Sequence, residues 1–100
     1  MSAFAGFVLI DLHFPEAESL KAKRKELSSI KAQLQTRLGV AVSEVDHQDL
    51  WQRATLAVAV TGGSQHAVEE SIDRIARFLD VRCPAGYRME RAVRSFQEVL

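Results

Sequence analysis

The chain of 100 residues is 47% hydrophobic and 26% charged, and this composition excludes a disordered, collagen-like or low-complexity protein. Thirteen Lys and Arg residues balance thirteen Asp and Glu residues, so the molecule as a whole has no field that attracts a polyanion. The length predicts one domain over residues 1–100. The longest apolar run, residues 3–10, is too short to cross a bilayer and lacks the charged start of a secretion signal. We therefore expect a cytoplasmic protein with no membrane partner.

The first predicted element is a strand over residues 4–14. Gly6 and the following Pro15 disfavour a helix, and the segment is apolar and short of turn residues. Because side chains alternate between the two faces of a strand, the polar residues near its end show which face is away from the core. The set expected to face the core is Val8, Ile10, Leu12 and Phe14, and the opposite set is Phe7, Leu9, Asp11 and His13.

A helix is predicted next, between residues 17 and 38, because the apolar spacing changes from two residues to 3.6. Ser19 is a suitable N-cap, and Gly39 stands where a left-handed residue would end the helix. The apolar stripe consists of Leu20, Leu27, Ile30, Leu34 and Leu38.

The second half of the chain predicts two strands, a helix and a last strand. Residues 40–45 and 53–61 are rich in β-branched residues, and the short connection between them indicates an antiparallel hairpin. Ser64 begins a second helix that runs to about Leu79, and a turn then leads to a strand over residues 87–96.

This order of elements predicts an α+β fold, the ferredoxin-like βαββαβ sandwich. With right-handed crossovers, a four-stranded antiparallel sheet in the order 4-1-3-2 lets two helices cover one face. The first strand then ends where the third begins and where the first helix starts. Residues from three distant segments are therefore expected at one rim of the sheet.

The predicted rim carries the one dense run of basic residues. All four lysines of the chain lie on the first helix, and cations near a helix N-terminus oppose the helix dipole, which indicates an anionic ligand. A tryptophan in the same region either closes the core or stacks on a nucleic-acid base. The alternative for the basic run is a solvated helix face. The candidate binding residues for RNA or a ribosome-associated partner are Lys21, Lys23, Arg24, His47, Trp51 and Arg53.

Imidazole and carboxylate groups at the same rim allow a metal-assisted hydrolase as a second hypothesis. The alternative is that the acidic residues cap the turn. His13 beside Asp11 or Asp49 would also make a polarised base, but no nucleophile has an evident partner, and we expect no cofactor. The candidate metal ligands are His13, Asp46, His47 and Asp49.

The sheet face without helices predicts an interface. Bulky apolar residues on the first strand and alanines on the third would leave an exposed apolar patch, and such patches usually mark contacts with other chains. We expect a homo-oligomer through this open face, and a purely structural protein that acts through this dimer is the third functional hypothesis. The candidate interface residues are Phe7, Leu9, Ala57 and Ala59.

Two blocks of sequence resemble the YlxP-like proteins, a family of short bacterial proteins of unknown function. One block is His-Phe-Pro at residues 13–15 with Ser-Leu-Lys-Ala-Lys-Arg at 19–24, and the other is Val-Asp-His-Gln-Asp-Leu-Trp-Gln-Arg-Ala at 45–54. The resemblance covers nearly the whole chain. Glu16 departs from the family pattern, in which many relatives have a small residue after the proline, and it adds a negative charge beside the basic run.

The resemblance implies a ferredoxin-like fold and no established activity, cofactor or catalytic residues. Relatives are often encoded near genes for transcription elongation, translation initiation and ribosome maturation, which indicates a role close to RNA. Our leading hypothesis is a small non-enzymatic protein that binds RNA or ribosomal particles. The sequence leaves open whether the protein is an enzyme.

Overall fold

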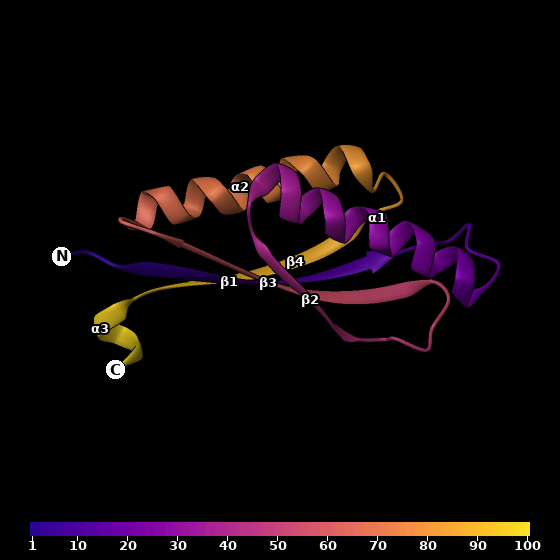
Figure 1. Ribbon diagram of the computed structural model, residues 1–100, viewed down its shortest axis with the longest axis horizontal. Helices are drawn as coiled ribbons and strands as arrows, with labels where there is room; N and C mark the ends of the chain where they lie inside the picture. Colours follow the sequence, from indigo (N-terminus) through magenta and orange to yellow (C-terminus); the bar gives the residue numbers. More distant parts are fainter.

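The computed structural model describes residues 1–100. A four-stranded sheet carries two long helices on one face, and a one-turn C-terminal helix lies on the other side of the sheet, at its end (Figure 1). The strand order β2-β3-β1-β4 is the predicted 4-1-3-2 order counted from the opposite edge, and every neighbouring pair is antiparallel. The predicted α+β class is confirmed. The strands are β1 (Phe4–His13), β2 (Ala41–Asp46), β3 (Arg53–Gly62) and β4 (Tyr87–Ser95), and the helices are α1 (Leu20–Leu38), α2 (Gln65–Arg82) and α3 (Phe96–Val99).

The core lies between the sheet and the two long helices. The predicted phase of β1 is confirmed, because Val8 and Ile10 are completely buried whereas Phe7 and Leu9 are exposed on the other face. Seventeen buried hydrophobic residues form one continuous cluster from β1, β3, α1 and α2 and the segments next to them. The opposite face of the sheet has no covering layer, as predicted, except at one end, where Phe96 and Val99 of the one-turn helix α3 line a pocket with Ala5 and Arg94 (Figure 1).

The predicted helix boundaries of α1 are confirmed by its caps. The Ser19 hydroxyl accepts a hydrogen bond from the Ala22 backbone N–H at 3.0 Å. Gly39 ends the helix at φ 64°, the left-handed conformation that glycine adopts without strain.

The C-terminus differs from the prediction, because a one-turn helix, α3, follows β4. Ser95 and Glu98 form a capping box: the Ser95 hydroxyl accepts from the Glu98 N–H, and the Glu98 carboxylate accepts from the Ser95 N–H at 2.8 Å. The hydrogen bond from the Ser95 N–H lowers the pKa of Glu98, with a further contribution from the Ser95 hydroxyl. The Ser-x-x-Glu spacing at residues 95–98 is the sequence signal for this helical turn. The prediction relied on alternation alone and therefore continued the strand to residue 96.

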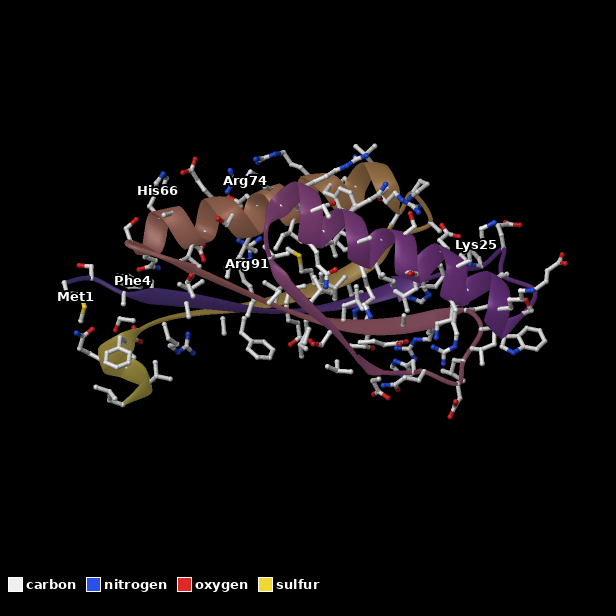
Figure 2. The ribbon with its side chains drawn as sticks, in the orientation of Figure 1. Met1, Phe4, Lys25, His66, Arg74 and Arg91 are labelled. Carbon is white, nitrogen blue, oxygen red and sulfur yellow. The ribbon has the colours of Figure 1, made fainter.

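β4 is held to α2 by charged side chains on the helix-covered face. Arg91 Nη1 lies 3.0 Å from Asp73 Oδ1 and 3.8 Å from Glu69 Oε2. Figure 2 shows Arg91 between the sheet and α2. At the start of the same strand, the Tyr87 hydroxyl donates a hydrogen bond to Asp80 Oδ1 at 2.6 Å. These contacts fix the outer strand β4 against the helix layer.

We expect alkaline pH to destabilise the protein through Tyr87. Burial raises its pKa from 10 to about 12, with a further contribution from Asp80. Since the folded pKa lies above the unfolded one, this stabilisation is complete below pH 10 and is lost as the pH rises from 10 to about 12. Tyr87→Phe should lower the free energy of unfolding by about 1 kcal/mol near neutral pH and should flatten its fall above pH 10. Urea denaturation at several pH values above 10 measures how steeply the free energy of unfolding of each protein falls with pH. An equally steep fall in the wild type and in Tyr87→Phe would show that Tyr87 is not the cause.

Candidate binding site at the β2–β3 loop

The loop of residues 47–52 joins β2 to β3 at the rim where β1 ends. His13 and Arg53 are cross-strand neighbours, so the last residue of β1 lies beside the first residue of β3. The Phe14 N–H donates to the Gln52 carbonyl at 2.9 Å, and Gln52 Nε2 donates to the Pro15 carbonyl at 3.3 Å. The predicted meeting of the end of β1 with the β2–β3 loop is therefore confirmed.

Lys23 is buried, and its prediction as a ligand-binding cation was wrong. Its Nζ donates a hydrogen bond to the His47 carbonyl at 2.7 Å and lies 3.8 Å from Glu44 Oε2. The side chain occupies the buried stripe of α1 one turn before Leu27, which explains why it points inward. Burial lowers the pKa of Lys23, while the Glu44 carboxylate opposes this shift. Lys23 therefore connects α1, β2 and the loop and is not available to a ligand.

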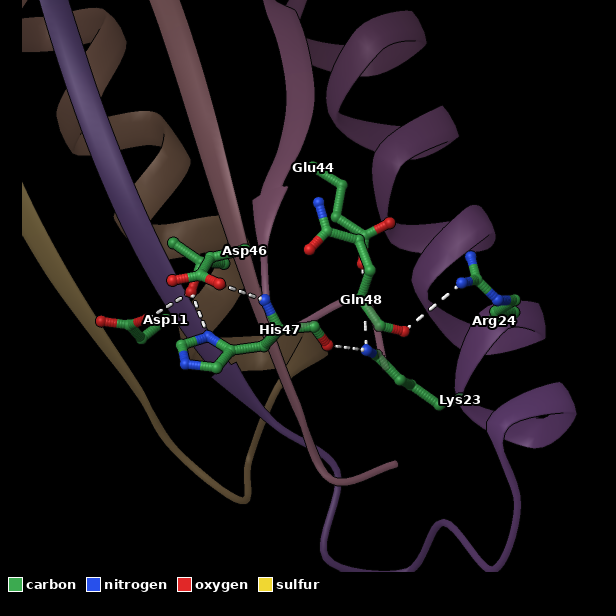
Figure 3. Close-up of polar contacts among 8 residues, drawn as sticks. Asp11, Lys23, Arg24, Glu44, Asp46, His47 and Gln48 are labelled. Atoms are coloured by element: carbon green, nitrogen blue, oxygen red, sulfur yellow. Dashed lines mark hydrogen bonds and ion pairs between the residues drawn. The ribbon is translucent and has the colours of Figure 1, made fainter. Parts of the chain in front are cut away.

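A second cation of α1 contacts the same loop from outside. Arg24 is exposed, and its Nη2 donates to the Gln48 carbonyl at 3.3 Å. Figure 3 shows Lys23 and Arg24 reaching from neighbouring positions of α1 to successive loop carbonyls. Lys21 and Lys25 are also exposed on α1. The helix thus fixes the loop with the side chains of Lys23 and Arg24, and Lys21, Arg24 and Lys25 are exposed on its first turns.

His47 has a strained backbone and begins the loop. Its φ of 62° makes it the only non-glycine residue with a positive φ. Such strain persists only where neighbouring contacts impose it. Asp46 Oδ1 accepts from the His47 N–H at 2.7 Å, and Lys23 holds the carbonyl of the same residue. The backbone of His47 is therefore fixed on both sides.

The His47 ring is fixed by a hydrogen-bonded chain that crosses two strands (Figure 3). His47 Nδ1 lies 2.8 Å from Thr55 Oγ1, and Thr55 donates to Asp11 Oδ1 at 2.7 Å. Because the Asp11 carboxylate only accepts, the Thr55 hydroxyl proton is committed to it, and Nδ1 must carry the proton shared with Thr55. Thr55, in the middle of this chain, is 9% exposed, whereas 34% of the Asp11 side chain is exposed to solvent. His47 Nε2 has no hydrogen bond within the chain, and in the neutral ring with the proton on Nδ1 it can accept one from a ligand.

The predicted metal site is wrong. Nowhere in the structure do three His, Cys, Asp or Glu side chains come together as metal ligands. Asp46 is turned toward the N–H of the next residue, as the alternative interpretation predicted, and Nδ1 of His47 is committed to Thr55. Asp11, which the sequence suggested as a partner for His13, instead receives the Thr55 hydroxyl and lies 3.9 Å from Arg53.

The loop presents two large apolar side chains to solvent. Trp51 is 53% exposed and Leu50 is 46% exposed, so the tryptophan does not close the core. They line a shallow hollow together with Asp49, Gln52 and Arg53. Arg53 keeps 46% of its side chain exposed. The hollow therefore combines an accessible indole face with a cation and a carboxylate.

Sequence reasoning missed the structural role of Thr55, Glu44 and Gln48. Thr55 carried a usable signal, because it is a polar residue on the open face in a strand of alanine, valine and leucine. Its neighbour on β1 is Asp11, the only acidic residue of that strand. Nothing in the sequence indicated that the Gln48 carbonyl accepts from Arg24.

Comparison with known proteins now places the chain in a family. Residues 5–90 match the family described as "Protein of unknown function (DUF503)". The chain belongs to this family. The DUF503 chain is also similar to "Uncharacterized protein YlxP" of Bacillus subtilis (strain 168). The two sequences are 33% identical over 75 residues, which are 75% of this chain and 82% of that protein. The resemblance seen in the two sequence blocks is confirmed.

Among solved structures, this DUF503 chain is similar to "De novo designed protein Foldit4". The TM-score is 0.57 at 13% sequence identity, and the match covers 92% of this chain and 96% of the designed one. A likeness at this identity shows the fold alone. In this DUF503 structure, no helix is both long and apolar enough to span a membrane.

Proposed function

We propose that this protein binds single-stranded RNA through a loop rim, which we define as the exposed side chains of Lys21, Arg24, Lys25, Trp51 and Arg53. The observation that carries the proposal is the 53% exposure of Trp51 on a loop that is fixed from both sides. An exposed indole face is a platform on which a base can stack, and such stacking contributes about 1–3 kcal/mol per base. The neighbouring cations would contact the phosphates that flank the stacked base.

The rigidity of the loop favours binding. Lys23 and Arg24 hold the carbonyls of His47 and Gln48, and the Phe14 N–H holds that of Gln52, so the loop is anchored at both ends. A side chain on a fixed loop loses less conformational entropy when it binds than one on a mobile loop. Trp51 is therefore presented to a ligand at a small entropic cost.

The charge distribution predicts moderate and salt-sensitive affinity. The whole molecule has no net charge, so attraction to RNA must come from the loop rim alone. Asp49 lines the same hollow as Trp51 and opposes a phosphate there. We therefore expect the bases to lie over the hollow and the backbone to follow α1, where Lys21, Arg24 and Lys25 are exposed. His47 Nε2 adds one acceptor for a base or ribose donor.

Trp51 itself is the reporter for the test. It is the only tryptophan of the chain, so quenching of its fluorescence by a short uridine-rich RNA would report stacking directly. Trp51→Ala should weaken binding about tenfold in an anisotropy assay, and Trp51→Phe should retain most of the affinity. Phe96→Ala removes an exposed aromatic ring elsewhere and is the matched control. Unquenched fluorescence at saturating RNA, or equal affinity of wild type and Trp51→Ala, would refute the proposal.

A further inference from the structure

The open face of the sheet arranges bulky and small side chains in a regular order. On β1, Phe7 is 56% exposed and Leu9 is 40% exposed. Their neighbours on β3 are alanines, Ala59 and Ala57. Three successive rows, read from β2 to β4, are Ala41, Ala59, Phe7 and Ala92, then Ser43, Ala57, Leu9 and Glu90, then Asp46, Thr55, Asp11 and Arg88.

We infer that a second copy of this chain covers the open face, related by a twofold axis that runs parallel to the strands between β1 and β3. This rotation keeps every row at its level and reverses its order, so β1 lies over the β3 strand of the partner. Phe7 then packs on the partner's Ala59, and Leu9 packs on the partner's Ala57. Each bulky side chain meets a small one, which is the arrangement that two close-packed sheets require.

The charges on the outer strands fit the same rotation. β4 lies over the β2 strand of the partner, so Arg88 faces the partner's Asp46, and this ion pair occurs twice. Glu90 faces the partner's Ser43, and Ala92 faces the partner's Ala41. No like charges meet in these three rows.

A twofold axis perpendicular to the strands and placed between the Phe7 and Leu9 rows brings like charges together. It would reverse the order of the rows and set Phe7 against the partner's Leu9. The Arg88 row would then meet the row of Ala5 and Arg94, which are cross-strand neighbours on β1 and β4. Arg88 would face the partner's Arg94, and like charges at an interface are unfavourable. The parallel axis avoids these like-charge contacts and pairs Arg88 with Asp46, and the charge exchange described below tests it.

The face is large enough for a stable dimer. The strands have 10, 6, 10 and 9 residues, and at about 3.3 Å per residue and about 4.8 Å between strands they give a surface of about 550 Å² per copy. The total of about 1,100 Å² exceeds the area of most crystal-packing contacts and lies near the lower end of specific protein interfaces. Phe7 and Leu9 stand close to the axis, where burial from water is most complete.

One consequence links this dimer to RNA. A rotation about an axis parallel to the strands leaves the loop rims of both copies at the same end of the dimer. This consequence, unlike the dimer itself, rests on the proposed function. An RNA long enough to reach both rims would bind more tightly than a short one.

Sedimentation equilibrium tests the dimer. The wild type should be dimeric at micromolar concentrations, and Phe7→Asp should raise the dissociation constant about 30-fold or more. Because Phe7 is largely exposed in one copy of the chain, the Phe7→Asp variant should unfold at a temperature close to that of the monomeric wild type. Val81→Asp, at an 84% exposed position on α2, is the matched control and should stay dimeric. A wild type that stays monomeric up to about 200 µM would overturn the inference.

A charge exchange tests the axis. Arg88→Asp and Asp46→Arg each place like charges together in their own homodimers, so each variant alone should dimerise at least tenfold more weakly. In a heterodimer of the two variants, both positions again hold opposite charges, and mixing should restore dimerisation. Failure of the mixture to restore it would overturn the parallel axis. Trp51→Ala should dimerise normally, so loss of RNA binding and loss of the dimer are separable results.

Discussion

Replacing Lys23 by alanine should lower the free energy of unfolding by about 3–5 kcal/mol, the usual cost of removing one partner from a buried ion pair. Glu44 Oε2 is buried without a hydrogen bond, and the Lys23 ammonium at 3.8 Å is its only compensating charge. The His47 carbonyl would also lose its 2.7 Å hydrogen bond from Nζ. Urea denaturation followed by circular dichroism measures the loss.

Two further variants separate this role from a general effect of charge. Lys25→Ala removes the same charge two positions along α1 from an exposed side chain and should change stability by less than about 0.5 kcal/mol. Glu44→Gln in the Lys23→Ala background removes the unpaired charge and should recover part of the loss. If Lys23→Ala and Lys25→Ala were equally stable, the buried pair would contribute nothing to the fold.

The elements of the fold could be predicted because local signals agreed with one another. Alternation in β1 identified Val8 and Ile10 as core residues. The apolar stripe with a period of 3.6 residues identified the buried Leu27, Ile30 and Leu34 of α1. Ser19 and Gly39 marked the two ends of that helix, and the structure has both caps. Since the elements and their order were correct, the handedness of crossovers left few topologies to consider.

The position of Lys23 could not be predicted, because its burial depends on tertiary contacts. Lysine is rarely buried unless paired, so a lysine in a basic run is expected at the surface. Its partners, Glu44 and the His47 carbonyl, lie more than twenty residues away in sequence. Gly6 is a similar case: the sequence used it only as a residue unfavourable to helix. In the structure a Cβ there would lie 2.7 Å from Val68 Cγ1, so glycine allows α2 to pack closely on β1.

The candidate site was predicted at the level of segments and not of contacts. The sequence placed Asp11 beside His13 because they share a face of β1. Strand register instead sets Asp11 opposite Thr55, which links it to His47. A positive φ at His47 turns its ring toward this pair. Neither the strand register nor the turn geometry can be predicted from the spacing of polar residues. For this reason the residues predicted as metal ligands do not come together in the structure.

Reversing Lys21 and Arg24 to glutamate should weaken RNA binding about 100-fold at low salt, because two attractive contacts with phosphates become repulsive. The slope of log affinity against log salt concentration should fall by about 1.4, the value for two lost contacts with single-stranded RNA. Arg24 also donates to the Gln48 carbonyl from an exposed position, so a small loss of stability is expected as well. Anisotropy titrations over a range of salt concentrations measure both the affinity and the slope.

The matched control reverses Arg74 and Arg77, two exposed arginines of α2. Arg74 lies on the helix layer well away from Lys25 (Figure 2). Both double variants change the net charge of the molecule by the same amount, from zero to −4 by replacement of two cations with two anions. If attraction came from the charge of the whole molecule, the two would lose affinity equally. If the RNA contacts the loop rim directly, only the double variant Lys21→Glu with Arg24→Glu should lose affinity for RNA. An equal loss of affinity in the control variant would show that the RNA does not bind at this rim.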